Sequence, residues 1–165
     1  MEYVSTRDKS RKVSASYAIA NGIAPDGGLY CPASFPALTA EDWHALANLD
    51  YKGRSALVLG KFLTDFSGEE LADYAAKAYA DDKFGGADTA PVVALGGGKH
   101  MLELWHGPTC AFKDMALQML PHQLTAATDH KGNRVEYTYD GVGNQTEILY
   151  PCLLYTSDAA DDLIG

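Results

Sequence analysis

The sequence is short of cysteine and of long apolar runs. Cys31, Cys110 and Cys152 include no CxxC pair, which argues against a disulfide framework and a zinc site and favours a reducing, cytoplasmic compartment. No apolar stretch approaches the roughly 20 residues that cross a bilayer, and the first residues lack the apolar segment of a signal peptide. We therefore expect no membrane partner.

Basic residues are also scarce. The chain has 13 Lys and Arg against 22 Asp and Glu, a formal charge of −9, which argues against a nucleic-acid partner because phosphate neutralisation needs clustered cations. The charge is uneven, since residues 129–165 hold seven acids and two bases. This imbalance suggests a different origin for the tail.

What is present is typical of one globular domain. Apolar residues make up 47% and charged residues 21% of 165 positions. Apolar spacing, caps and turn residues predict alternating helices and strands. Helices are expected over 13–21, 39–48, 51–64, 67–84 and 113–127, the last kinked or restarted at Pro121, and strands over 29–31, 91–95 and 99–105.

The run 102–118 carries the residue best suited to covalent chemistry. It predicts a strand, a Gly-Pro turn and a helix whose first turn holds Lys113. A lysine amine becomes nucleophilic where burial or positive potential lowers its pKa, and a helix start supplies such potential. On the residues alone, a solvated Lys113–Asp114 charge pair is the more common outcome.

The segment His106–Asp114 resembles the lysine motif of the threonine synthases. Upstream, 3–7, 26–32 and 66–67 resemble that family's opening segments in the same order. The resemblance implies an α/β fold, the N-terminal portion of a fold type II pyridoxal-phosphate enzyme, with Lys113 as the catalytic and cofactor-binding lysine. It also implies O-phosphohomoserine as the small-molecule substrate.

Several other residues have two interpretations each. Ser5, Thr6 and Arg7 either bind the substrate phosphate, as bidentate arginine does, or form a polar segment without a ligand. His106 either orients the loop or touches substrate. The remaining candidates are interpreted as structural: His44 and His122 on helices, Cys110 as a packing residue, and 96–98 as a hairpin turn rather than a phosphate cradle. No spacing of ligands suggests a metal.

The resemblance predicts three parts. Residues 1–90 are expected to be the threonine synthase N-terminal region, 91–128 the truncated start of the pyridoxal-phosphate domain, and 129–165 a non-native, poorly ordered tail. The family's glycine-rich cofactor-phosphate loop is missing, so we expect the chain to be inactive. Another lyase of the same fold type and a non-enzymatic Rhs-repeat fragment are the alternatives.

The tail has a character of its own. Residues 137–144 (Tyr-Thr-Tyr-Asp-Gly-Val-Gly-Asn) resemble one tyrosine–aspartate repeat of the Rhs type and predict a β-hairpin. A single repeat cannot bury its own face. Residues 152–162 resemble a translated sequencing adapter. These features favour a chimera, and a genuine acidic tail is the alternative.

Overall fold

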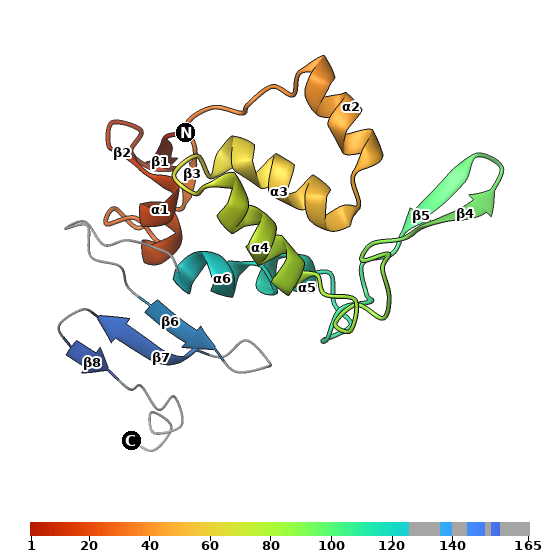
Figure 1. Ribbon diagram of the computed structural model, residues 1–165. Coiled ribbons are helices and arrows are strands. Elements are labelled where there is room, and N and C mark those ends of the chain that lie inside the picture. Colours follow the sequence, from red (N-terminus) through yellow and green to blue (C-terminus); the bar gives the residue numbers. More distant parts are fainter. Residues whose placement is uncertain (126–135, 140–144, 151–152, 156–165) are drawn as a thin grey trace.

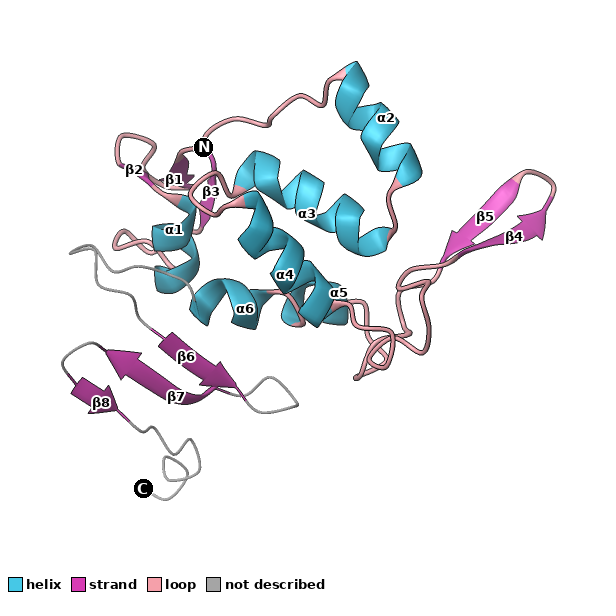
Figure 2. Cartoon of the chain, in the orientation of Figure 1, coloured by secondary structure: helices cyan, strands magenta, loops and turns pink. Residues whose placement is uncertain are grey.

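The computed structural model describes residues 1–125, 136–139, 145–150 and 153–155. In these ranges the strands form three separate sheets, all antiparallel. Figures 1 and 2 show the helices gathered centrally, with one hairpin projecting to the side. In chain order the elements are β1 (Tyr3–Ser5), β2 (Lys12–Val13), α1 (Ala15–Asn21), β3 (Tyr30–Pro32), α2 (Ala40–Asn48), α3 (Tyr51–Phe62), α4 (Gly68–Ala78), β4 (Val92–Gly96), β5 (Lys99–Leu102), α5 (Asp114–Leu117), α6 (Leu120–Thr125), β6 (Glu136–Tyr139), β7 (Gln145–Tyr150) and β8 (Leu153–Tyr155).

The N-terminal sheet was not predicted in full. β1 lies between β2 and β3, with Tyr3 opposite both Val13 and Pro32. Only β3 was expected, one residue earlier. The helix expected to begin at Val13 begins at Ala15 instead, because Val13 pairs in β2 and Ser14 caps α1 through its side chain. Strands of two and three residues are too short to give an alternating pattern.

Side-chain N-caps fix the starts of the first four helices. A side-chain oxygen of Ser14, Thr39, Asp50 and Ser67 accepts a backbone N–H one turn into α1, α2, α3 and α4 respectively. Such caps satisfy N–H groups that have no partner within the helix. The predicted starts at Thr39 and Ser67 are confirmed, and the capping box between Ser67 and Glu70 is complete.

Helix α4 supplies the centre of the core. Leu71, Ala75 and Ala78 recur every three or four residues and are at most 1% exposed, as expected for the buried stripe of an amphipathic helix. One cluster around α4 contains Ala75, Ala78, Tyr79, Phe84 and Met119, and the other contains Ala15, Leu63, Phe66 and Leu71. Residues of α4 therefore pack on one side against the N-terminal elements and on the other against Met119, which directly precedes α6.

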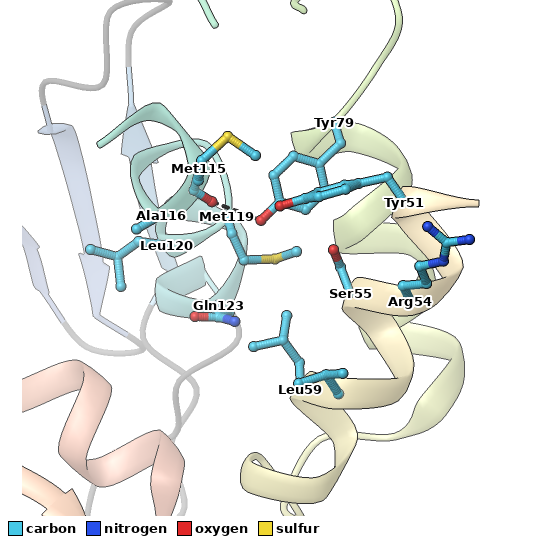
Figure 3. A pocket seen from close by; sticks show the side chains of 11 residues that line it. Tyr51, Arg54, Ser55, Leu59, Tyr79, Met115, Ala116, Met119, Leu120 and Gln123 are labelled. Carbon is cyan, nitrogen blue, oxygen red and sulfur yellow. Dashed lines mark hydrogen bonds between the residues drawn. The ribbon is translucent and has the colours of Figure 1, made fainter. Parts of the chain in front are cut away.

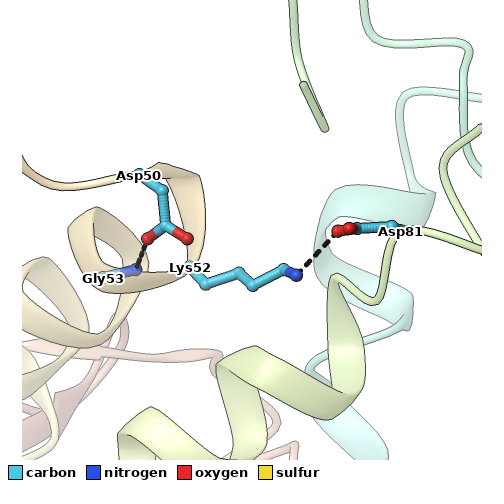
Figure 4. A network of polar contacts seen from close by, with 4 residues as sticks. All are labelled: Asp50, Lys52, Gly53 and Asp81. Atoms are coloured by element: carbon cyan, nitrogen blue, oxygen red, sulfur yellow. Dashed lines mark hydrogen bonds and ion pairs between the residues drawn. The ribbon is translucent and has the colours of Figure 1, made fainter. Parts of the chain in front are cut away.

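An ion pair ties the start of α3 to the segment after α4. The Lys52 ammonium lies 2.7 Å from a carboxylate oxygen of Asp81, and Asp50 caps the same turn of α3 by accepting the Gly53 N–H (Figure 4). The bond to Asp81 raises the pKa of Lys52. At the same end, the Tyr51 and Tyr79 rings meet edge to face with centroids 4.9 Å apart.

The helix expected over 113–127 is divided in two. α5 ends at Leu117 and α6 begins at Leu120, so Pro121 lies in the first turn of a new helix. Proline lacks an N–H and its ring clashes with the carbonyl four residues before it, so an early position is the one it tolerates. Of the two outcomes expected at Pro121, a kink and a restart, the structure shows the restart, and the first piece of the helix begins at Asp114, one residue after the expected start.

The glycine run 96–98 is a hairpin turn, as predicted. Gly97 and Gly98 have φ values of 59° and 73° and connect β4 to β5. Positive φ at both central residues is the geometry of the tight hairpin turn that favours glycine. All residues of the two strands are exposed, so the hairpin projects from the helices (Figure 1).

The hairpin expected in the tail is also present. β6 pairs antiparallel with β7, and β7 with β8. The predicted turn residues 140–144 and the adapter-like residues 156–162 lie outside the described residues.

Candidate active site

Lys113 lies where the loop after β5 becomes α5. It is the N-cap residue of that helix and makes no side-chain capping bond. Its side chain is exposed. Among the described residues, no ion pair or hydrogen bond engages its ammonium group. Because α5 has only four residues, the helix-start potential expected to activate Lys113 is weak.

The next residue, Asp114, is fully buried and does not form the expected ion pair with Lys113. Its Oδ2 accepts the Thr109 N–H at 2.8 Å, and its Oδ1 accepts the Thr109 hydroxyl at 2.8 Å. A buried carboxylate is stable only where such donors replace water. The solvated charge pair considered for these two residues is therefore wrong.

Gly107 allows this arrangement. A Cβ placed there would lie 2.5 Å from both Cβ and Oδ2 of Asp114, so any side chain would displace the carboxylate. Cys110 adopts a positive φ of 55° and donates its N–H to the Gly107 carbonyl at 3.0 Å. Residues 107–114 therefore form a tight loop that fixes the backbone of Lys113.

His106 directly precedes that loop, and its side chain contacts two neighbouring residues of the chain. Its Nε2 lies 2.7 Å from Oε2 of Glu103, and its ring stacks on Trp105 with centroids 5.7 Å apart. These contacts fit the interpretation that His106 orients the loop. Sequence reasoning did not predict the Thr109–Asp114 and Glu103–His106 pairs. The one signal for them in the sequence is that the partners are only five and three residues apart.

The other predicted site residues lie in and after β1. The buried Ser5 donates its hydroxyl to Asp26 Oδ1 at 2.8 Å, and the Arg7 Nη1 donates to the Asp26 carbonyl at 3.0 Å. The hydroxyl of Thr6 accepts the Leu29 N–H at 3.0 Å. Hydrogen bonds from the Gly28 N–H and Ser5 lower the pKa of Asp26.

These contacts join two of the motifs found in the sequence, 3–7 and 26–32. They do not join either motif to the lysine loop, because no hydrogen bond or ion pair within the described ranges links Ser5, Thr6 or Arg7 to Lys113. Their role in substrate binding therefore stays a prediction.

The two helical histidines differ in their surroundings. His44 is exposed on α2. His122 is half-buried, and its ring stacks on Tyr74 with centroids 6.2 Å apart. Burial, followed by the charges of Lys83 and Lys77, lowers the pKa of His122. No group of three His, Cys, Asp or Glu suited to a metal occurs in the part of the chain that is described.

Sequence reasoning missed a groove that α5 helps to line (Figure 3). It has a volume of about 580 Å³ and is bounded by α3 on one side and by α5 and α6 on the other. We name it the α3–α5 groove. Its lining is mostly apolar and consists of Tyr51, Arg54, Ser55, Val58, Leu59, Tyr79, Met115, Ala116, Met119, Leu120 and Gln123.

Comparison with known proteins identifies the first part of the chain. The family model described as "Threonine synthase N terminus" matches residues 2–79. The threonine synthase of Corynebacterium glutamicum is 42% identical over 125 residues, covering 73% of this chain and 26% of that protein. Over these residues, the chain is similar to the N-terminal part of the threonine synthases.

Other threonine synthases agree. That of Methylobacillus glycogenes is 33% identical over 168 residues, covering 98% of this chain and 33% of the relative. The crystal structure of PLP-bound threonine synthase from Brucella melitensis matches with a TM-score of 0.72 and 35% identity, over 81% of this chain and 29% of that one. These matches confirm the expected fold class.

Two facts limit how far the similarity to threonine synthases extends. The chain spans a third or less of the length of these threonine synthases. A second family model, "RHS Repeat", matches residues 122–151, which confirms the Rhs-type resemblance of the tail. The domain boundaries at 90 and 128 and the chimeric origin of 129–165 stay predictions.

Among the described residues, no helix is long and apolar enough to cross a membrane.

Proposed function

We propose that residues 1–125 are the lysine-bearing N-terminal part of a threonine synthase, which converts O-phospho-L-homoserine and water to L-threonine and phosphate. The observation that carries the proposal is the loop 107–114. It fixes the backbone next to an exposed lysine whose ammonium has no partner among the described residues.

The residues of the lysine loop fit pyridoxal phosphate as the cofactor. An aldehyde requires an accessible amine, and Lys113 provides one. When bound, the cofactor supplies an electron sink for carbanion chemistry. Lys113 would hold it through Nζ and, once released, move protons at that atom. The buried Asp114, through its two hydrogen bonds with Thr109, keeps the lysine backbone in place.

The described residues offer no comparable place for the cofactor's phosphate. The run 96–98 connects two exposed strands and does not precede a helix, so it lacks the geometry of a helix-start anion site. For this reason we expect the 165-residue chain alone to produce no threonine.

The substrate phosphate is assigned to Ser5, Thr6 and Arg7. Arg7 is exposed and forms no ion pair within the described residues, and its one bond to Asp26 leaves most of the guanidinium donors for a ligand. Ser5 and Thr6 anchor the segment through Asp26 and Leu29. An Arg7→Lys variant keeps the charge and loses the bidentate geometry.

A graft tests the function. Residues 1–125 would replace the matching part of the Brucella melitensis threonine synthase, and phosphate release from O-phosphohomoserine would be measured. We expect activity that Lys113→Ala abolishes and that Lys99→Ala, at an exposed lysine of the β4–β5 hairpin, leaves unchanged. An active Lys113→Ala graft would contradict the assignment. Arg7→Lys is expected to raise KM for the phosphorylated substrate.

Two other functions are alternatives for this chain. The first is another lyase of this fold type, which would release ammonia from serine or threonine in the graft assay. The His-Gly-Pro-Thr sequence at 106–109 does not favour this alternative. A non-enzymatic Rhs-repeat role applies to residues 122–151, where the family match and the antiparallel strands β6 and β7 support it. We also infer a cytoplasmic location from the scarcity of cysteine, which fractionation of source cells would check.

A further inference from the structure

Residues 92–120 expose an unusual share of apolar side chains. Of the fourteen large apolar residues that are exposed in the described chain, nine lie in this segment. Soluble monomers rarely leave such a concentration in water, and it commonly marks a surface that another chain segment covers. The nine are Val92, Val93, Leu95, Met101, Leu102, Trp105, Phe112, Leu117 and Leu120.

This segment borders the α3–α5 groove. Leu120 belongs to both and is 39% exposed, and Val58 on the opposite wall is 37% exposed. The hydroxyl of Tyr79 donates to the carbonyl of Met115 at 2.7 Å, which fixes α5 relative to the end of α4 (Figure 3). The groove is therefore a preformed apolar depression and not a gap between independent helices.

We propose that this groove and the exposed apolar residues of 92–120 together form a docking surface for the remaining part of a threonine synthase. The proposal rests on the function proposed above. The match to the Brucella melitensis structure covers 29% of that protein, so most of its chain lies outside the matched part and is long enough to cover this surface. The surface described here is where most of the exposed large apolar side chains of residues 1–125 occur.

The distribution of exposure supports this occupant over a small ligand. Residues 1–91 expose only Ile23, Leu29, Phe35, Trp43 and Val58 among their large apolar side chains, and Val58 lies on the groove wall. Exposed apolar residues are therefore much sparser in this region than in 92–120. Along the chain, the exposed residues instead run from the hairpin through α5 to the groove, a longer stretch than a pocket for a small molecule requires.

The test is co-expression. The full 165-residue chain, carrying an affinity tag, would be produced together with an untagged Brucella melitensis threonine synthase that lacks its matched N-terminal part. We expect the two to purify as an equimolar complex. Leu120→Asp places a charge in the groove at the first turn of α6, a position that tolerates aspartate, and is expected to reduce recovery of the untagged piece at least tenfold.

The matched control is Trp43→Asp, which places the same charge in the first turn of α2 at a side chain that is 62% exposed. It is expected to change recovery less than twofold. Absence of a complex, equal effects of the two variants, or self-association of the chain through Leu120 that excludes the untagged piece would overturn the proposal.

A second measurement separates this proposal from the function. The purified complex would be treated with pyridoxal phosphate and borohydride, and labelled lysines identified by mass spectrometry. A complex sensitive to Leu120→Asp with a label at Lys113 supports both proposals. The same complex without that label supports the docking surface and rejects the role of Lys113.

Discussion

The hydroxyl of Thr109 should contribute more to stability than an exposed threonine normally does. It donates at 2.8 Å to Asp114, whose carboxylate is fully buried. Thr109→Val keeps the shape of the side chain and leaves Oδ1 of Asp114 without its donor. Hydrogen bonds to charged groups contribute about 1.5–3 kcal/mol, and we expect the variant to lose ~2 kcal/mol of unfolding free energy.

Urea denaturation followed by circular dichroism measures this loss. With a urea m-value of about 1–3 kcal/mol per M for a small domain, the midpoint should fall by roughly 1 M. Thr109→Ser keeps the hydroxyl and serves as the control, with a midpoint near that of the parent chain. The N–H of Thr109 still bonds Oδ2 in every variant, so only the hydroxyl is tested.

A double-mutant cycle with Asp114→Asn isolates the pair. The coupling energy should be about 1–2 kcal/mol, as found for residues that share a buried hydrogen bond. Equal midpoints for the Val and Ser variants, or a coupling energy near zero, would refute the reasoning that Asp114 depends on Thr109 for its burial.

Three further predictions concern stability. Gly107→Ala should cost about 1–3 kcal/mol or more in urea, because its Cβ would overlap Asp114, and a neutral result would show that the loop moves freely. Ser67→Ala should cost ~1 kcal/mol by removing the capping box with Glu70, whereas Ser34→Ala at an exposed loop position should not shift the midpoint. The folded-state pKa of His122 is lowered by burial, so the unfolded chain binds the proton first and stability falls as the pH drops through about 6.5. His122→Gln should therefore reduce the loss of stability between pH 7.5 and 5, and identical losses in both proteins would contradict this.

Sequence reasoning located most helices because their ends carry local signals. Thr39 and Ser67 each bond a backbone N–H only three residues away, so the signal lies within one turn. Pro121 likewise acts on its own helix. The restart it causes follows from the missing N–H and was expected as one of two outcomes.

Long-range partners were harder to predict. β1 pairs with residues about 10 and about 27 positions away, and three-residue strands carry no periodic pattern that would show it. For the site, Lys113 was identified through its motif, whereas the burial of Asp114 depends on Gly107 having no side chain. That contact is three-dimensional, and a Lys-Asp dipeptide in sequence suggests the opposite, a solvated charge pair.

The position of β1 has a consequence for how the chain is made. It leaves the ribosome before β2 and β3 and is the middle strand of their sheet, so it has no partner there until both have been synthesised. Until then its unpaired backbone groups are open to other chains. A bulky fusion placed directly before Glu2, whose carbonyl accepts the Ala33 N–H, would therefore disturb the sheet from its centre outward. A fusion at the other end leaves that assembly step untouched.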